Sequence, residues 1–271
     1  MNKYWKQICS YTFAVTTGSF AFIPEESFSL LISWSFLPSY WNETVNKILF
    51  LILVGLLISI AMCLWQNFRR KITLKGQNYK ITIRYGDIFE LSSCKKVISF
   101  DECFNTEIGN APHEIKPSSI CGQFLQRFPN IDVNSLLSEY QLKPQRKLSE
   151  FGNKECYKLG TIIPNNEYLL MAFGKLNKDG RATMEREEYL AALSALWKEI
   201  DKYDTQSDVA IPVLGAGITR FKGELLTQQQ LIDIIIASYK ISPYKIKLPN
   251  SLHIICKERE DFCLDKIGNT L

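Results

Sequence analysis

Two long apolar segments set the start of the chain apart from the rest. Residues Ile48–Trp65 carry no charged side chain, and the basic triplet Arg69-Arg70-Lys71 follows shortly afterwards. This length matches the hydrocarbon core of a bilayer, and cations beyond such a segment are typical of the cytoplasmic side. The pattern therefore predicts a transmembrane helix. A wholly buried core helix is the alternative, although such helices are usually shorter.

The earlier apolar segment, Ile8–Ile23, is richer in Thr and Ser, and Lys3 and Lys6 precede it. Basic residues thus stand at the outer ends of both segments, which by the positive-inside rule places both termini in the cytoplasm. We expect a transmembrane helical hairpin over residues 1–70, with helices at about 8–23 and 48–65, in a multi-pass protein of the cell inner membrane. A secretory signal cleaved near Ser19-Phe20-Ala21 is the alternative for the first segment.

Beyond residue 70, short apolar runs alternate with segments of helical period. The runs predict strands at Tyr79–Arg84, Lys96–Phe100, Cys156–Ile163, Glu167–Phe173, Val209–Val213 and Leu252–Cys256. The periodic segments predict helices at Ser118–Phe128, Val133–Tyr140, Met184–Lys202, Thr227–Ser238 and Asp261–Ile267. Such alternation predicts an α/β domain over residues 71–271, with a mixed sheet sandwiched between helices.

Composition narrows the classes of function. With 46% hydrophobic and 22% charged residues the chain is not a disordered tail, and a net charge of +4 without clustered basic and stacking residues argues against nucleic acid as a partner. The eight cysteines are scattered and form no Cys-x-x-Cys pair, which indicates reduced thiols. His113 and His253 are the only histidines, so we expect no metal site and no cofactor.

Three loops qualify as ligand loops because each follows a predicted strand, and α/β sheets bind ligands beyond the carboxyl ends of their strands. They are Gly86–Leu91, Asp101–Pro117 and Leu214–Gly223. The last contains Gly215-Ala216-Gly217 and precedes a capping box at Thr227 and Gln230. Backbone amides of such a turn bind phosphate, although glycines also serve strand-to-helix turns for steric reasons alone.

From Lys71 to the C-terminus, these loops resemble the ligand loops of a macro domain, the ADP-ribose-binding fold. Gly86-Asp87-Ile88 matches the family's Gly-Asp-Ile, and the resemblance implies that Asp87 accepts a hydrogen bond from the adenine amino group. Pro212–Phe221 matches the family's second phosphate loop at Gly217, Ile218 and Phe221. Arg220 replaces a small residue there and adds a forked donor suited to phosphate or carboxylate.

The candidate ligand-binding residues belong to the three loops and to the start of the helix after the second loop. They are Asp87, Ile88, Asp101, Asn105, Ile120, Gly215, Ala216, Gly217, Ile218, Thr219, Arg220 and Phe221. The loop Asp101–Pro117 corresponds to the first phosphate loop of the macro-domain family. It lacks the Asn-Ala-Ala-Asn stretch and the run of glycines that hydrolytic members of the family carry there. We therefore expect a binding protein without catalytic residues. The alternative is a membrane-tethered ADP-ribosylhydrolase or phosphoesterase that uses Asp101, Glu102 or Glu107 as its general base.

The whole arrangement, a two-helix membrane anchor joined to a divergent macro domain, resembles the membrane effectors of type II Thoeris anti-phage defence. The resemblance implies a TIR-domain partner that consumes NAD and releases an ADP-ribose conjugate carrying histidine. Binding of this conjugate would drive homo-oligomerisation and disruption of the bilayer, and so cell death (abortive infection). A structural membrane protein whose α/β domain binds only protein is a further alternative.

Overall fold

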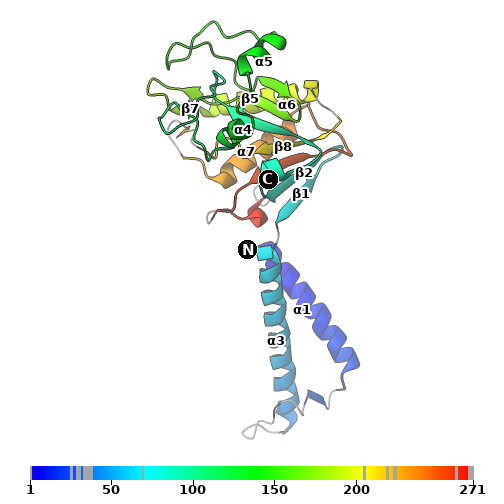
Figure 1. Ribbon diagram of the computed structural model, residues 1–271. Coiled ribbons are helices and arrows are strands. Elements are labelled where there is room, and N and C mark those ends of the chain that lie inside the picture. Colours follow the sequence, from blue (N-terminus) through cyan, green and yellow to red (C-terminus); the bar gives the residue numbers. More distant parts are fainter. Residues whose placement is uncertain are drawn as a thin grey trace. The chain divides into compact units, whose positions relative to one another are not determined.

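The chain forms two compact units, Met1–Arg69 and Arg70–Leu271 (Figure 1). The computed structural model describes residues 2–24, 27–28, 32, 39–68, 70–203, 206–217, 220–221, 225–259 and 262–267.

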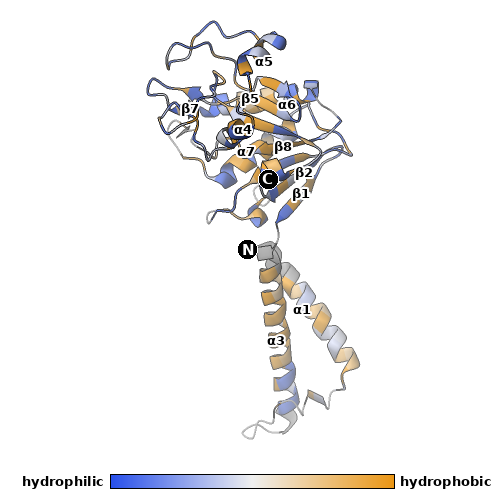
Figure 2. Cartoon of the chain, viewed as in Figure 1, coloured by the Kyte–Doolittle hydropathy of each residue, from blue (hydrophilic) through white to orange (hydrophobic). Residues whose placement is uncertain are grey.

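The described residues of the first unit form two long helices, α1 (Asn2–Phe22) and α3 (Ser39–Phe68). They contact each other: the ring centroids of Phe20 and Phe50 are 6.0 Å apart. Among the described residues one helical stretch is long and apolar enough to cross a membrane, the 24 residues Trp41–Leu64 with mean hydropathy 2.7. In Figure 2 the ribbon of α3 has the hydrophobic colour along most of its length. The prediction at 48–65 thus falls within a longer helix, and the structure does not establish α1 as a second span.

The second unit is built on a seven-stranded sheet with the order β1-β2-β10-β8-β3-β5-β4. The strands are β1 (Lys71–Lys75), β2 (Lys80–Tyr85), β3 (Cys94–Phe100), β4 (Ile162–Asn165), β5 (Tyr168–Ala172), β8 (Asp208–Pro212) and β10 (Leu252–Cys256). Neighbours from β2 to β5 run parallel, whereas the edge strands β1 and β4 pair antiparallel. The predicted mixed sheet is confirmed.

Helices cover both faces of this sheet (Figure 1). The long helices α6 (Arg186–Tyr203) and α7 (Gln228–Ile241) share a core with Val97 of β3. On the other face α4 (Ile120–Arg127) and α5 (Val133–Glu139) pack against Ile98 and Phe100 of the same strand. Successive side chains of a strand point to opposite faces, so β3 supplies both cores. The predicted sandwich is confirmed.

Several smaller elements differ from the prediction. Strand β1 and the small sheet of β6 (Lys175–Leu176), β7 (Ala182–Met184) and β9 (Arg220–Phe221) were not expected. The predicted strand at 156–163 begins too early, because only its end belongs to β4. The predicted closing helix at 261–267 is wrong. Its described residues contain a single 3-10 turn, η2 (Leu264–Lys266), since so short a segment gains too few hydrogen bonds to nucleate an α-helix.

The capping box that was predicted before α7 is confirmed in atomic detail. Thr227 Oγ1 accepts a hydrogen bond from the Gln230 amide at 3.2 Å, and Gln230 Oε1 accepts one from the Thr227 amide at 2.8 Å. Both residues satisfy amides that the helix leaves unpaired. The capping box therefore fixes Thr227 as the residue before the first turn of α7.

Candidate ligand-binding site

A cavity of about 340 Å³ lies beyond the carboxyl ends of the parallel strands. Phe100, Phe173, Pro212 and Ile255 line it, at or just after the ends of β3, β5, β8 and β10. This is the edge at which open α/β sheets bind ligands, and the volume lies within the range of small-molecule sites. The second and third predicted ligand loops both contribute to its walls.

The glycine turn after β8 forms one wall, through Gly215, Ala216 and Gly217. Gly215 has φ +84°, and a Cβ there would lie 3.0 Å from the ring of Phe221. Gly217 is exposed, and a Cβ there would meet no atom within 4 Å. The two glycines thus differ: backbone conformation and packing require the first, whereas the second keeps space open beside the cavity.

The remaining predicted residues of this turn divide into three groups. Ile218 and Thr219 lie outside the described residues, as does the side chain of Arg220, whose backbone belongs to β9. Phe221 is buried beneath Gly215 and packs edge-on against Tyr189, with ring centroids 5.3 Å apart. It therefore supports the turn from below and does not line the cavity.

Asp101 lines the cavity at the start of the second loop. Its Oδ1 accepts hydrogen bonds from the amides of Cys103 (2.9 Å) and Asn105 (3.0 Å), and no described residue donates a hydrogen bond to Oδ2. Burial raises the pKa of this carboxyl, whereas the neighbouring backbone amides and the positive charge of Lys154 oppose that shift. The site therefore holds a desolvated carboxyl with one oxygen unused by the protein.

Asn105 does not reach the cavity. Its side-chain amide donates to the carbonyl of His113 at 3.1 Å, and its oxygen accepts from the amide of Glu107 at 3.3 Å. It ties together two distant parts of the loop. His113 lines the cavity and stacks on Phe151, with ring centroids 4.9 Å apart. Asn105 therefore holds the loop in place, and His113 lines the cavity.

The Gly86-Asp87-Ile88 motif lies outside the cavity wall. Asp87 caps the 3-10 turn η1 (Ile88–Glu90) by accepting from the amide of Phe89 at 2.9 Å. Ile88 is buried against Ile255, which does line the cavity. Ile120, at the first turn of α4, is half-buried and forms part of the wall. Of the predicted pair at η1, neither side chain forms part of the cavity.

Three exposed cations, which the sequence analysis did not single out, stand at the cavity: Lys116, Lys257 and Arg259. Arg259 also donates to the carbonyl of Ala216 at 3.0 Å, which links the end of β10 to the glycine turn. Cations just after a strand's carboxyl end were the available signal. Together with the turn they make the mouth electropositive, as a phosphate-bearing ligand requires.

The acids proposed for a general base occupy different environments. Glu102 is buried and accepts from the Ser149 hydroxyl at 2.9 Å, and burial raises its pKa. Neither Glu102 nor the exposed Glu107 lines the cavity, so Asp101 is the one of the three that does. Within the described residues no group of three His, Cys, Asp or Glu side chains could hold a metal ion.

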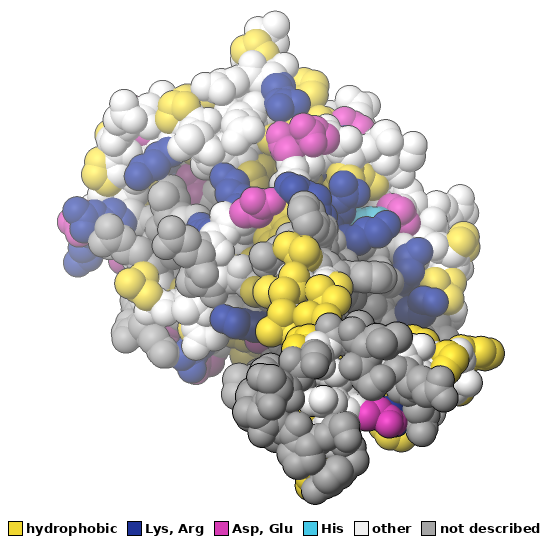
Figure 3. Space-filling model, turned by 90° about the horizontal axis from the view of Figure 1, so that it is seen from below, with side chains coloured by type: hydrophobic (Ala, Val, Ile, Leu, Met, Phe, Trp, Pro, Cys, Tyr) yellow, Lys and Arg dark blue, Asp and Glu magenta, His cyan; other side chains and the backbone are white. Residues whose placement is uncertain are grey.

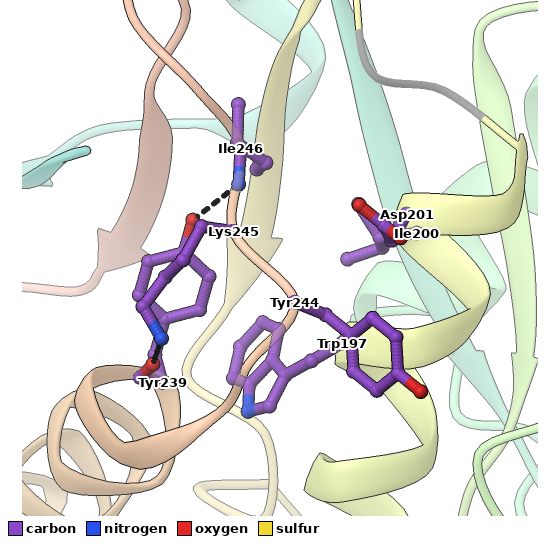
Figure 4. Close-up of a pocket in the computed structure, with 7 residues that line it drawn as sticks. All are labelled: Trp197, Ile200, Asp201, Tyr239, Tyr244, Lys245 and Ile246. Carbon is purple, nitrogen blue, oxygen red and sulfur yellow. Dashed lines mark hydrogen bonds between the residues drawn. The ribbon is translucent and has the colours of Figure 1, made fainter. Parts of the chain in front are cut away.

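A second cavity, between α6 and the segment after α7, is too small for an organic ligand. Its volume is about 10 Å³, room for a single water at most (Figure 4). Tyr239 accepts there from the amide of Ile246 at 2.8 Å, and Lys245 donates to the carbonyls of Tyr239 and Ser242. These contacts close the last turn of α7 and serve packing.

A mixed sheet between two helical layers, with a ligand-sized cavity beyond its parallel strands, is the architecture of a ligand-binding α/β protein. The family model "Thoeris protein ThsA, Macro domain" matches residues 81–257, more than half of the chain. Thoeris protein ThsA of Bacillus amyloliquefaciens (strain Y2) is 32% identical over 219 residues, covering 77% of this chain and 73% of that protein. The chain therefore belongs to the Thoeris ThsA macro-domain family.

Solved structures were also compared. The macrodomain of Thermus aquaticus DarG has 16% identity and a TM-score of 0.40, covering 66% of this chain and 98% of that one. Thermosipho africanus DarTG in complex with ADP-ribose has 15% identity and a TM-score of 0.43, covering 73% of this chain and 47% of that one. Membership of the family follows from the similarity in sequence.

Proposed function

We propose that this chain is a bacterial anti-phage defence effector whose domain over residues 71–271 binds an ADP-ribose derivative of the histidine-conjugate type, made by a TIR-domain partner. Membership of the Thoeris ThsA family supports the role in defence. The observation that carries the choice of ligand is a single cavity that combines the Gly215–Gly217 turn, three cations and the half-buried Asp101. A nucleoside diphosphate derivative complements all three.

Each part of the cavity matches one part of such a ligand. Exposed backbone at Gly217, with Lys257 and Arg259 nearby, suits a diphosphate. The free oxygen of Asp101 suits a donor, either a ribose hydroxyl or a nitrogen that carries a proton. A desolvated carboxylate gains most from a donor that arrives with the ligand, because water no longer solvates it. The cavity thus favours a ligand with both acidic and donor groups.

The N-terminal unit supports a membrane role. The 24 residues Trp41–Leu64 are long enough to span a bilayer's hydrocarbon core, and only 6% of this apolar stretch is buried inside the protein. Hydroxyls in both helices bond back to carbonyls four residues earlier: Thr16 to Thr12, Ser19 to Val15 and Ser59 to Gly55. Polar groups satisfied within their own helix are compatible with lipid.

We propose further that α1 crosses the membrane beside α3, with both termini in the cytoplasm. Residues 69 and 70 alone separate α3 from β1, so the sequence connection between the two units is short. Ligand binding would favour an oligomeric arrangement that disrupts the inner membrane and kills the infected cell. The ligand can drive this only by binding that arrangement more tightly than the resting one.

Calorimetric titration of the full chain in detergent micelles tests the binding step. We expect saturable binding of ADP-ribose or of its histidine conjugate, and no heat with histidine alone. Absence of binding by both nucleotides contradicts the proposal. In a second assay, vesicles that contain the chain and an entrapped dye should release the dye when the ligand is added. Binding of the ligand without release of the dye would support the binding step and refute the proposed disruption of the membrane.

A membrane-tethered ADP-ribosylhydrolase remains the second candidate, and Asp101 is the observation that favours it. Its carboxyl has a raised pKa and a free oxygen in the cavity, both of which a general base can use. Incubation with an ADP-ribosylated protein separates the two readings. Release of ADP-ribose by the native chain, lost in Asp101→Asn, would show an enzyme; unchanged substrate after prolonged incubation favours the receptor.

A further inference from the structure

Strands β1 and β2 present four cations on one face of the sheet. In their antiparallel register Lys71 lies opposite Arg84, and Lys75 lies opposite Lys80. Opposite residues point to the same face, and the hydroxyls of Thr73 and Thr82 between them, 3.4 Å apart, confirm this. We call these four cations the cation face; Thr73 between them is exposed, whereas Thr82 is buried. Each of the two cross-strand pairs in the cation face therefore consists of two positive charges directly opposite each other.

Such an arrangement is unfavourable for an isolated hairpin, because like charges directly opposite destabilise a strand pair. Within the described part of the chain, none of the four cations makes an ion pair; the nearby Glu258 pairs with Arg70 at 2.7 Å. Lys71, Thr73 and Lys75 are exposed and Lys80 and Arg84 are half-buried, whereas the alternate residues of β1 pack toward the core on the other face. The cation face is therefore free to meet an anionic partner.

The usual reason for lysines on a sheet edge does not account for all four cations. Edge strands carry lysine to prevent pairing with other chains, which explains Lys71 and Lys75 on β1. Lys80 and Arg84 lie on β2, which is paired on both sides. Further along this face, at the inner strands, Asp208 contacts His253 at 3.0 Å, so its charge is engaged there. An excess of positive charge remains.

Sequence position indicates the partner. Lys71 follows the end of α3 at Phe68 by three residues, and Trp41–Leu64 of that helix is long and apolar enough to span a membrane. Figure 3 shows Lys and Arg side chains at several places on one side of the molecule, with Asp and Glu side chains among them. Basic segments that adjoin a membrane span bind anionic lipids at roughly 1 kcal/mol per cation. We propose that the cation face docks on anionic phospholipid headgroups, an inference that rests on the proposed membrane anchor.

Amine footprinting of the full chain in lipid nanodiscs tests this docking. Nanodiscs of phosphatidylcholine are compared with nanodiscs that also contain phosphatidylglycerol, and the acetylation of individual lysines is measured by mass spectrometry. We expect several-fold less labelling of Lys71, Lys75 and Lys80 with the anionic lipid, reversed by high salt. The exposed Lys143 and Lys178 serve as internal controls and should not change.

A variant pair sharpens the result. Lys75→Gln with Lys80→Gln should lower the docked-to-undocked ratio roughly 30-fold, read as restored labelling of Lys71. Lys143→Gln with Lys178→Gln removes the same charge elsewhere and should leave protection intact. Labelling that is equal in both lipids would overturn the docking, for instance in favour of an acidic protein as partner.

Retention in the nanodiscs separates this inference from the anchor. Retention in both lipids with selective protection supports both ideas, and retention in both without protection refutes the docking alone. A chain retained only by the anionic lipid, with its three lysines protected, would support docking and refute the anchor. Retention in neither refutes both.

Discussion

The two glycines of the turn after β8 give a sharp prediction, because the structure assigns them different roles. Gly215 has φ +84°, and a Cβ would lie 3.0 Å from Phe221 and 3.4 Å from Leu231. The left-handed conformation costs alanine about 1–2 kcal/mol, and crowding adds about 1 kcal/mol. Gly215→Ala should therefore lose about 2–3 kcal/mol of folding free energy and lower the unfolding midpoint by roughly 4–12 °C.

Gly217→Val should behave in the opposite way. An added Cβ meets nothing within 4 Å, so the change in folding free energy should stay within about 0.5 kcal/mol. The new side chain would occupy the space where the diphosphate meets the backbone. Loss of two charge-assisted hydrogen bonds costs about 3–6 kcal/mol, which weakens ADP-ribose binding by roughly two to four orders of magnitude.

Thermal unfolding of the full chain in detergent micelles and calorimetric titration of the same samples measure both effects. The predicted pattern is a stability defect in Gly215→Ala and a binding defect without a stability defect in Gly217→Val. Native affinity in Gly217→Val would refute the assignment of this turn to the diphosphate. An undiminished midpoint in Gly215→Ala would refute the steric argument.

Three further predictions concern the cavity and its support. Burial raises the pKa of Asp101 above its ordinary 3.8, so protonation of this carboxyl stabilises the fold at low pH, and this contribution is lost as the pH rises through the raised pKa. Asp101→Asn should therefore flatten that part of the curve of unfolding midpoint against pH, and an unaltered slope would contradict this role of Asp101. Lys257→Gln and Arg259→Gln should each weaken ADP-ribose binding by roughly 2- to 5-fold in a salt-dependent manner, whereas Lys178→Gln should not; equal effects at all three positions would indicate non-specific charge. Thr227→Ala removes the capping box and should lower the free energy of unfolding by about 1 kcal/mol, measured as an unfolding midpoint lowered by roughly 2–4 °C. An unchanged midpoint would show that packing alone holds α7.

Local pattern was sufficient for the main elements of the domain. Strand β10 matches its predicted bounds because Leu252–Cys256 is an isolated apolar run. The start of α7 was predictable because the capping box is written in two residues three positions apart. Strand β1 was not, since a five-residue strand is stabilised by pairing with β2 and by packing on the distant η2, neither of which a local pattern reveals.

The site was predictable in outline only. The glycine turn and Asp101 follow apolar strands, and both line the cavity. Asp87 fits its motif equally well, but its carboxylate bonds to the backbone two residues on, a local alternative that short polar side chains often take. Residue type alone did not single out Lys257 and Arg259, because exposed cations occur everywhere on protein surfaces; their position just after the predicted strand Leu252–Cys256 was the one available signal. The fold decides which of them stand beside the turn.

The structure of the full chain bound to ADP-ribose tests the central claim most directly. The account predicts the diphosphate beside the Gly215–Gly217 turn, within reach of Lys257 or Arg259, and a donor of the ligand at the free oxygen of Asp101. A ligand found outside this cavity, or one whose phosphates face away from the glycine turn, would contradict it.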